Sequence, residues 1–464
     1  MQPMQHKNPL RSGAGGTPAL SGNTAAVIRF IRDTIYEDLP PEVRHQSKRC
    51  LLDGLGAFLA GTETPVGRLM ARFAGSQMAG DEATVLATGG RASAVGAALA
   101  NGFAGNALDI DDGYRRVKGH PGACVLPAVL VAAELAAPVP GDEFLTALVV
   151  GYELGIRAGL IRHARYPVYH ASGSWGAVAG AGAAGRLLRL SPDALRHALG
   201  AAEYHAPIAP MMKGIAAPSM VKDGIGWGAM VAVASARLAA DGFTGIDPLF
   251  DDAPEPDWIL GLGAEYEILN LYFKPYAACR WAQPAVDGAL RVMRQHGLAP
   301  AEIVRIEVAT FSAAVALSRT PPADTEAAQY NMAFPIVAAL LDGAVGPRQV
   351  LPPRLFDPDI REMMARVAVS VSPAFEAAFP EKTYAEVTLE TADGRRLVSG
   401  RMEARWEPPD TLPDDGALME KFRELVAPVR GERTAAELID RIFNLDRVPD
   451  VSGLVAACRP RMAD

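Results

Sequence analysis

The sequence predicts a mainly α-helical protein with a smaller α+β part. Three observations indicate this. Apolar residues recur at helical spacing from residue 24, they alternate at strand spacing in several segments after residue 275, and helical spacing returns from residue 414. We therefore expect an all-helical domain over 24–274, an α+β lid domain over 275–408, and C-terminal helices over 409–464 that pack back on the helical domain. The cleft between two such units is a common place for a ligand.

The helical part begins with a clear amphipathic segment. Ile28, Ile31 and Ile35 are spaced by three and four residues, which places them on one face of a helix. Residues 1–23, which precede it, are rich in Gly, Pro and polar side chains and contain no apolar stretch of the signal-peptide kind. We expect this N-terminal segment to be disordered.

One helix of this part should lie deep in the core. Residues 174–185 read SWGAVAGAGAAG, which is nearly all small residues. The glycines could suggest a phosphate-binding loop, but no strand is predicted before them, and such a glycine pattern alone is weak evidence. We interpret the segment as a buried helix that neighbouring helices approach closely.

The pattern changes after about residue 275. Alternating apolar residues predict strands, and Asp393-Gly394 predicts a hairpin turn between the last two of them. The predicted strands are 303–308, 367–371, 384–391 and 396–402. The predicted helices between these strands are 281–296, 326–342 and 358–366.

Composition excludes several classes of function. The net charge is −8, and charged residues make up 21% of the chain, which argues against a nucleic-acid-binding groove. The sign of the whole chain still permits an anionic ligand in a locally basic pocket. No uninterrupted apolar run reaches about 18 residues, so we expect no membrane span. The four cysteines are scattered without a CxxC motif, which fits a reducing cytoplasm and predicts no zinc site.

The main candidate for a functional site is the stretch 101–127, which reads NGFAGNALDIDDGYRRVKGHPGACVLP. Asp109, Asp111 and Asp112 fall within four residues, and His120 follows between a glycine and a proline. Helix-forming apolar segments flank this loop on both sides. Acidic groups and an imidazole on a loop between buried helices are typical of an active site, where the imidazole titrates near neutral pH.

The same aspartates could also bind a metal ion. However, no second acidic motif, no HExxH motif and no EF-hand loop accompanies them. We therefore expect no metal.

Two further groups of candidates lie outside this stretch. His170 precedes the small-residue helix in a Gly/Ser-rich turn, and Lys222 lies in a Gly-rich turn before another helix. A lysine there could bind a carboxylate as a point charge, and Lys213 competes with Lys222 for this role.

A cationic and phenolic cluster is predicted at the domain junction. Lys274, Tyr276 and Arg280 occur together in FKPYAACRWAQP. A guanidinium beside a cleft is suited to a bidentate interaction with a carboxylate.

Five blocks in this order resemble the MmgE/PrpD family, which includes 2-methylcitrate dehydratase, cis-aconitate decarboxylase and iminodisuccinate epimerase. The blocks are NALDIDD with GHPGACVLPAVL, YHASGSWGAVAGAGAAGRLL, KPYAACRWAQPAVDG and AQYNMAFPIVAALLDG. The resemblance covers about residues 24–445. It implies an all-helical domain with a smaller α+β lid, a site between them, a homodimer, and no metal or organic cofactor.

The resemblance also assigns residues. It matches Asp109, His120, His170 and Lys222 to positions of the family site. The chain departs from the family pattern at Gln283, where many members have a histidine, and at Gly113, where decarboxylases have a hydroxyl residue.

The resemblance implies proton transfer at a carbon next to a carboxylate of a small di- or tricarboxylate, as in a lyase or an isomerase. His120 and His170 would transfer protons, and Asp109 would orient His120. Lys222, Arg280, Tyr276 and Lys274 would bind the substrate. An epimerase of an iminodisuccinate-like substrate and a non-catalytic carboxylate-binding protein are the alternatives.

Overall fold

The computed structural model describes residues 22–166 and 168–460. Most of the predicted disordered segment, residues 1–21, lies outside the described residues. Gly22 and Asn23 already belong to the first helix.

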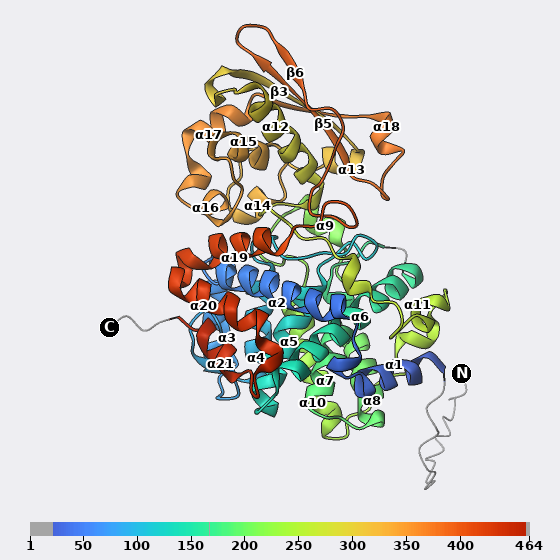
Figure 1. Cartoon of the computed structure of the whole chain (residues 1–464). Coiled ribbons are helices and arrows are strands. Elements are labelled where there is room, and N and C mark those ends of the chain that lie inside the picture. The colour runs from blue at the N-terminus through green and yellow to red at the C-terminus, as the bar shows by residue number, and fades with distance from the viewer. Residues whose placement is uncertain (1–21, 167, 461–464) are drawn as a thin grey trace, which may run out of the picture.

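Figure 1 shows a large helical part below and a smaller part with a sheet above, so the predicted fold class is confirmed. The positions of the predicted domain boundaries stay a prediction. The lower part contains a short two-stranded sheet and most of the helices. Its elements are α1 (Gly22–Asp33), α2 (Pro41–Gly61), α3 (Pro65–Gln77), β1 (Ala83–Thr84), β2 (Arg91–Ala92), α4 (Ala94–Asn106), α5 (Pro121–Ala136), α6 (Gly141–Arg165), α7 (Gly173–Leu187), α8 (Pro192–His205), α9 (Met211–Ala216), α10 (Ile225–Ala240) and α11 (Asp257–Leu260).

The upper part is built on a mixed sheet in the order β4–β3–β5–β6, with β7 also paired to β5. Strands β3 and β4 are parallel, and β5 is antiparallel to β3, β6 and β7. Helix α12 packs against β5 and α15 packs against α12. The elements are α12 (Gln283–His296), β3 (Ile303–Thr310), α13 (Ser312–Val315), α14 (Thr325–Gln329), α15 (Ala333–Asp342), α16 (Pro347–Val350), α17 (Pro358–Met364), β4 (Val367–Val371), α18 (Pro373–Glu376), β5 (Tyr384–Thr391), β6 (Arg396–Val398) and β7 (Met402–Glu403).

The last helices return to the lower part. They are α19 (Asp415–Arg430), α20 (Glu432–Phe443) and α21 (Ser452–Cys458). In Figure 1 these red helices lie beside the blue helices of the N-terminal region, and α19 packs against α2. Lys421 on α19 binds Asp53 on α2, with both side chains buried.

The predicted hairpin is confirmed, but one predicted helix is wrong. Strands β5 and β6 are joined through a turn in which Gly394 has a φ of 86°, a conformation that favours glycine. The segment 326–342 is not one helix. It divides into α14 and α15 because the Asn331 side chain accepts hydrogen bonds from the backbone N–H groups of Ala333 and Phe334, which caps a new helix.

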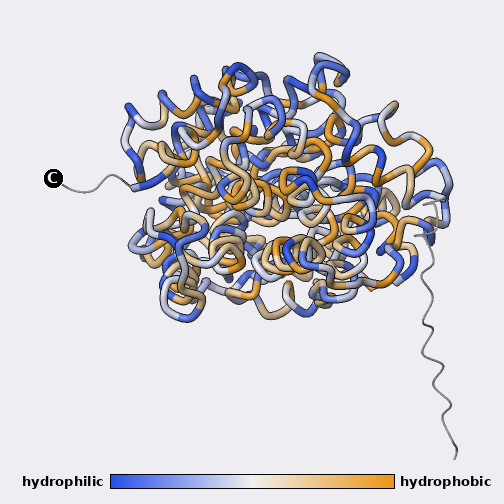
Figure 2. Tube along the Cα trace, turned by 90° about the horizontal axis from the view of Figure 1, so that it is seen from below, coloured by the Kyte–Doolittle hydropathy of each residue, from blue (hydrophilic) through white to orange (hydrophobic). Residues whose placement is uncertain are grey.

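Helix α7 is the buried packing helix that its composition predicts. A Cβ added at Gly176 would lie 2.2 Å from Cys124 Sγ, and one added at Gly182 would lie 2.4 Å from a methyl carbon of Leu154. The neighbouring helices α5 and α6 therefore approach its backbone too closely for any other residue. Figure 2 shows the same organisation, with apolar residues gathered toward the middle and hydrophilic ones along much of the periphery.

Helix α6 is long and apolar enough, by composition, to cross a membrane. In this fold the stretch is entirely buried among other helices, as expected for the core helix of a globular protein.

Candidate active site

A cavity of about 770 Å³, including space open to solvent, lies where the helical part meets the α+β part. Residues from both parts line its wall, and eight of them have side chains that can carry a charge. These are Asp109, Arg115, Lys118, His120, Asp223, Lys274, Arg280 and Glu407. Tyr169, Tyr272 and Tyr330 add phenol groups to the wall.

The side chains of the three aspartates after α4 contact different partners. The backbone of Asp109 has a φ of 49°, in the left-handed region, and its N–H donates to the carbonyl of Asn106 at 3.1 Å. This tight turn directs Asp109 to the cavity wall. Asp111 turns inward, where Asn106 Nδ2 donates to its Oδ1 at 2.9 Å.

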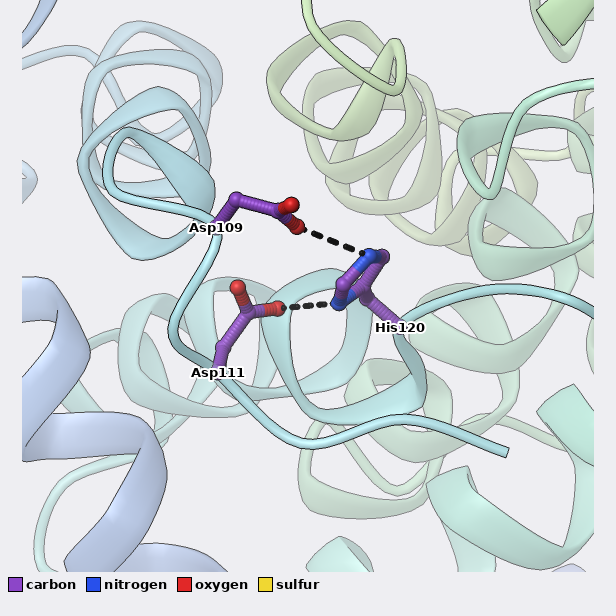
Figure 3. Close-up of side chains that lie close together, drawn as sticks. All are labelled: Asp109, Asp111 and His120. Atoms are coloured by element: carbon purple, nitrogen blue, oxygen red, sulfur yellow. Dashed lines mark ion pairs between the residues drawn. The ribbon is translucent and has the colours of Figure 1, made fainter. Parts of the chain in front are cut away.

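His120 lies between two of these carboxylates (Figure 3). Its Nε2 is 3.3 Å from Asp109 Oδ1, and its Nδ1 is 3.0 Å from Asp111 Oδ2. The residue stands at the N-cap position of α5, where Pro121 begins the helix. Its backbone N–H donates to Ser172 Oγ at 3.1 Å, which fixes the residue against the turn before α7.

The surroundings of His120 favour its charged form. Burial alone would lower the pKa of His120, but the charge and hydrogen bond of Asp111, supported by Asp109, outweigh burial and raise the pKa to about 9. In return, burial would raise the pKa of Asp111, but the His120 charge holds it below its ordinary value. The site therefore contains an imidazolium ion at neutral pH.

Asp112 has a structural role. Gly122 N–H donates to its Oδ1 at 3.0 Å, and the Tyr152 hydroxyl donates to its other oxygen. Burial, together with the nearby Asp53 carboxylate, raises the pKa of Asp112 to about 7. Asp112 does not line the cavity. It ties the loop to α5 and α6.

Lys274 and Arg280 both reach the cavity, but both are already engaged. Lys274 Nζ is 2.7 Å from Asp109 Oδ1, and both side chains are buried. Arg280 Nη2 is 2.8 Å from Glu407 Oε2, and its guanidinium lies over the Tyr272 ring at 4.5 Å from the centroid. Burial would raise the pKa of Glu407, but the guanidiniums of Arg280 and Arg115 hold it below its ordinary value.

Three predicted site residues do not line this cavity. The His170 ring stacks on His163 at 4.3 Å between centroids, and its Nδ1 is 2.6 Å from Ser174 Oγ. Burial, followed by the charges of His163 and Arg162, lowers the pKa of His170 to about 4, so this ring is neutral. The structure thus separates His170 from the cavity that contains His120.

The other two are Lys222 and Tyr276. Lys222 Nζ donates to Gln329 Oε1 at 2.5 Å and is buried, whereas its predicted competitor Lys213 is exposed to solvent. The Tyr276 hydroxyl donates to Asp287 Oδ1 at 2.7 Å, away from the cavity.

Sequence reasoning missed several cavity residues, and Asp223 and Tyr330 are the two of them that contact each other beside His120. Asp223 Oδ2 is 4.0 Å from His120 Nε2 and accepts from Ser172 Oγ at 3.1 Å. The Tyr330 hydroxyl donates to the other Asp223 oxygen at 3.3 Å. Burial raises the pKa of Asp223, although the His120 charge opposes this. Its position next to Lys222 in a Gly-rich turn was the one available signal.

The two departures from the family pattern have physical explanations. A Cβ at Gly113 would lie 2.3 Å from the Tyr272 hydroxyl, so the Tyr272 phenol occupies the space of a side chain at position 113. Gln283 is buried, and its Nε2 donates to the carbonyl of Ala278 at 2.9 Å. Its Oε1 accepts from Arg280, so Gln283 supports the segment that carries Arg280.

Among the residues that the structure describes, one group has the spacing of metal ligands. It consists of Asp109, Asp111 and His120, whose ligand atoms lie within 4.8 Å of one another. The ammonium of Lys274 already contacts Asp109, and a protonated imidazole offers no lone pair to a metal. These contacts favour a proton over a metal ion between the carboxylates, and the absence of a metal requirement stays a prediction.

The position of His120 predicts its titration. We expect the imidazole to titrate near pH 9, and Asp111→Asn to lower its pKa toward 6.5 because the neutral amide removes the main stabilising charge. Histidine-selective NMR titration measures both values, with His120→Gln identifying the signal. The folded pKa is the higher one, so this ionisation stabilises the fold below about pH 6.5, and the contribution disappears as pH rises through 9. A wild-type pKa near 6.5 would contradict the assignment.

The chain is similar to a known protein family over most of its length. Residues 26–255 match the MmgE/PrpD N-terminal domain, and residues 276–445 match the MmgE/PrpD C-terminal domain. The chain is 25% identical to a cis-aconitate decarboxylase of Aspergillus terreus over 94% of this chain and 96% of the relative. It is also 25% identical to the human cis-aconitate decarboxylase, over 90% of both chains. The expected family is therefore confirmed, and the chain belongs to the MmgE/PrpD family.

Proposed function

We propose that this protein is a lyase that decarboxylates a small tricarboxylate of the cis-aconitate kind, with His120 as the proton donor. The observation that carries the proposal is the position of His120 between Asp109 and Asp111 at the wall of a cavity, which favours its charged form. The names of the relatives support this chemistry, since they are cis-aconitate decarboxylases.

The charge of the cavity suits such a substrate. Its wall contains four permanently charged cations and the His120 imidazolium, against three carboxylates. The cavity therefore has an excess of positive charge in a chain whose net charge is −8. A locally basic pocket attracts a polycarboxylate and lowers the energy of the negative charge that develops on the reacting carbon.

The protonation state of His120 favours decarboxylation over the alternatives. When the bond between carbon and carboxylate breaks, carbon dioxide leaves and the electron pair stays on the carbon. That carbon then takes a proton from His120, which becomes neutral, so the reaction needs an acid and no separate base. The proton comes from Nε2, because Nδ1–H is held by Asp111 and by the carbonyl of Asp112 at 2.9 Å.

Dehydration and epimerisation both require a base that removes a proton from carbon. A second carboxylate of the cavity wall, Asp223, is near enough to serve as this base, since its Oδ2 lies 4.0 Å from His120 Nε2. An acid and a base so close together can serve a dehydration, which is the second candidate. An epimerase needs its two groups on opposite sides of the carbon, and this geometry fits that reaction less well.

The proposal assigns the predicted residues as follows. Asp109 orients His120, and Lys274 and Arg280 contribute positive charge to the cavity. His170, Lys222 and Tyr276 take no direct part in the proposed reaction, because their side chains do not line the cavity.

A panel of acids in deuterated water tests the function. It contains cis-aconitate, citrate, 2-methylcitrate and iminodisuccinate. Decarboxylation of cis-aconitate would release carbon dioxide and place one deuterium on the product carbon. The absence of both turnover and deuterium incorporation across the panel would instead support a non-catalytic carboxylate-binding protein.

His120→Gln should lower turnover by about 10²- to 10⁴-fold, the usual contribution of a positioned acid. Substrate affinity should change much less, because the cations of the wall remain. His296→Gln is the matched control, since His296 is exposed on α12 and does not line the cavity. Steady-state kinetics on the substrate found in the panel measure both effects, and near-normal turnover of a folded His120→Gln variant would refute the role.

Metal independence is tested with the same assay. Exhaustive chelation should leave turnover unchanged, because Lys274 and the His120 protons already neutralise Asp109 and Asp111. Loss of activity on chelation, restored by a divalent ion, would show that the Asp109–Asp111–His120 group binds a metal.

We also propose that the chain forms a homodimer through the surface from the end of α8 to the start of α10. Six large apolar side chains are exposed within this short stretch, whereas exposed apolar residues on monomers are usually scattered. They are Tyr204, Ile208, Met212, Met220, Val221 and Trp227.

Light scattering should give twice the chain mass for the wild type. The double variant Val221→Asp with Trp227→Asp should reduce it to that of one chain, because two charges on each copy would be buried at the interface. Leu260→Asp, on the more exposed Leu260 of α11, is the control and should remain dimeric. A wild-type protein with the mass of one chain would contradict the proposal.

A further inference from the structure

Lys118 differs from the other permanently charged cations of the cavity wall, which are Arg115, Lys274 and Arg280. Arg115 and Arg280 share the Glu407 carboxylate, and Lys274 pairs with Asp109. Within residues 22–166 and 168–460, no carboxylate forms an ion pair with Lys118. Among the described residues, its ammonium is thus the one cation of the wall with a permanent charge and no carboxylate partner.

The backbone that carries Lys118 is held in place on several sides. Its N–H donates to the carbonyl of Arg115 at 3.1 Å, and the Tyr169 hydroxyl donates to the Lys118 carbonyl at 2.7 Å. The hydrogen bond from Tyr114 N–H to the carbonyl of Gly119, at 2.9 Å, closes the loop. The φ of Lys118 is 49°, a left-handed conformation that favours glycine. These hydrogen bonds hold the Lys118 backbone in this conformation.

Among the residues that the structure describes, none forms a hydrogen bond with the Lys118 ammonium. The side chain is exposed, although it lines the cavity, and its Nζ lies 5.4 Å from the centroid of the Tyr169 ring. An exposed ammonium above an aromatic ring is held only weakly. An anionic group at the cavity entrance would be a much stronger partner for it.

Lys118 lies nearer to solvent than the groups that surround the reacting carbon. Asp109, His120 and Lys274 are all buried at the inner end of the cavity, whereas Lys118 is exposed. A small acid with its reacting carbon at His120 would therefore extend toward Lys118.

We propose that Lys118 binds a carboxylate of the substrate that does not react, at the outer end of the cavity. This inference rests on the proposed function, since it concerns the same cavity. In this proposal, Lys118 selects acids that have a second carboxylate in addition to the one near His120.

The test uses Lys118→Met, which keeps the length of the side chain and removes the charge. Binding of tricarballylate, an unreactive tricarboxylate, is measured by calorimetry on the full chain. Lys118→Met should raise the Kd by about 10- to 100-fold, the effect of losing one charge-assisted hydrogen bond, and Lys118→Arg should recover most of the affinity.

Arg116→Met is the matched control, because Arg116 is an exposed cation of the same loop that does not line the cavity. Its Kd should stay within about threefold of the wild type. For the substrate that is turned over, Lys118→Met should raise KM by a similar factor and leave kcat within about threefold, because His120 is unchanged.

The outcomes separate this inference from the proposed function. An unchanged Kd and KM for Lys118→Met, or an equal loss for Arg116→Met, would overturn the role of Lys118 and leave the lyase proposal intact. Weaker tricarballylate binding by Lys118→Met alone, in a protein that turns over no acid of the panel, would support Lys118 and overturn the lyase proposal.

Discussion

The arrangement of the site depends on the burial of an imidazolium between two carboxylates. Charges removed from water are stable only when they are paired, so His120, Asp109 and Asp111 need each other and need the shell around them. That shell extends far through the chain. Asn106 binds Asp111, and Lys421, from the C-terminal helices, donates to the carbonyl of Ile110 between the two aspartates at 2.7 Å.

The α+β part completes this charge balance. Lys274, at the junction with that part, neutralises Asp109, and the Gln329 side chain donates to the carbonyl of Ala107 at 3.0 Å while accepting from Lys222. The two parts of the molecule are thus joined by buried polar contacts around the cavity. Displacing one part from the other would expose unpaired charges, and the joined arrangement is the one that keeps water away from His120.

The sequence predicted contacts between residues that are close together in the chain and missed contacts between residues that are far apart in it. Asp109 and His120 lie in one loop, so their spacing was sufficient to bring them together. The pairing of Lys274 with Asp109 joins residues 165 positions apart, which no local pattern reveals. His170 has the same kind of turn before a helix as His120, yet its ring points to α7. Asp223 was not predicted as a site residue because its neighbour Lys222 was the more obvious candidate in that turn. The direction of a side chain within a turn depends on packing, which a single sequence does not show.

The close packing of α7 bears on how a protein of this architecture can evolve new selectivity. Gly176 and Gly182 leave no space for added atoms, so α7 and the Ser172 turn before it cannot shift to accommodate a different ligand. The loop over 113–119 is fixed by backbone hydrogen bonds, and some of its side chains face solvent. Substitution of the exposed Lys118 in this loop changes the cavity entrance without disturbing the core. In this architecture, a substitution at the rim of the cavity can therefore alter selectivity at little cost in stability, whereas a substitution around His120 would leave buried charges unpaired.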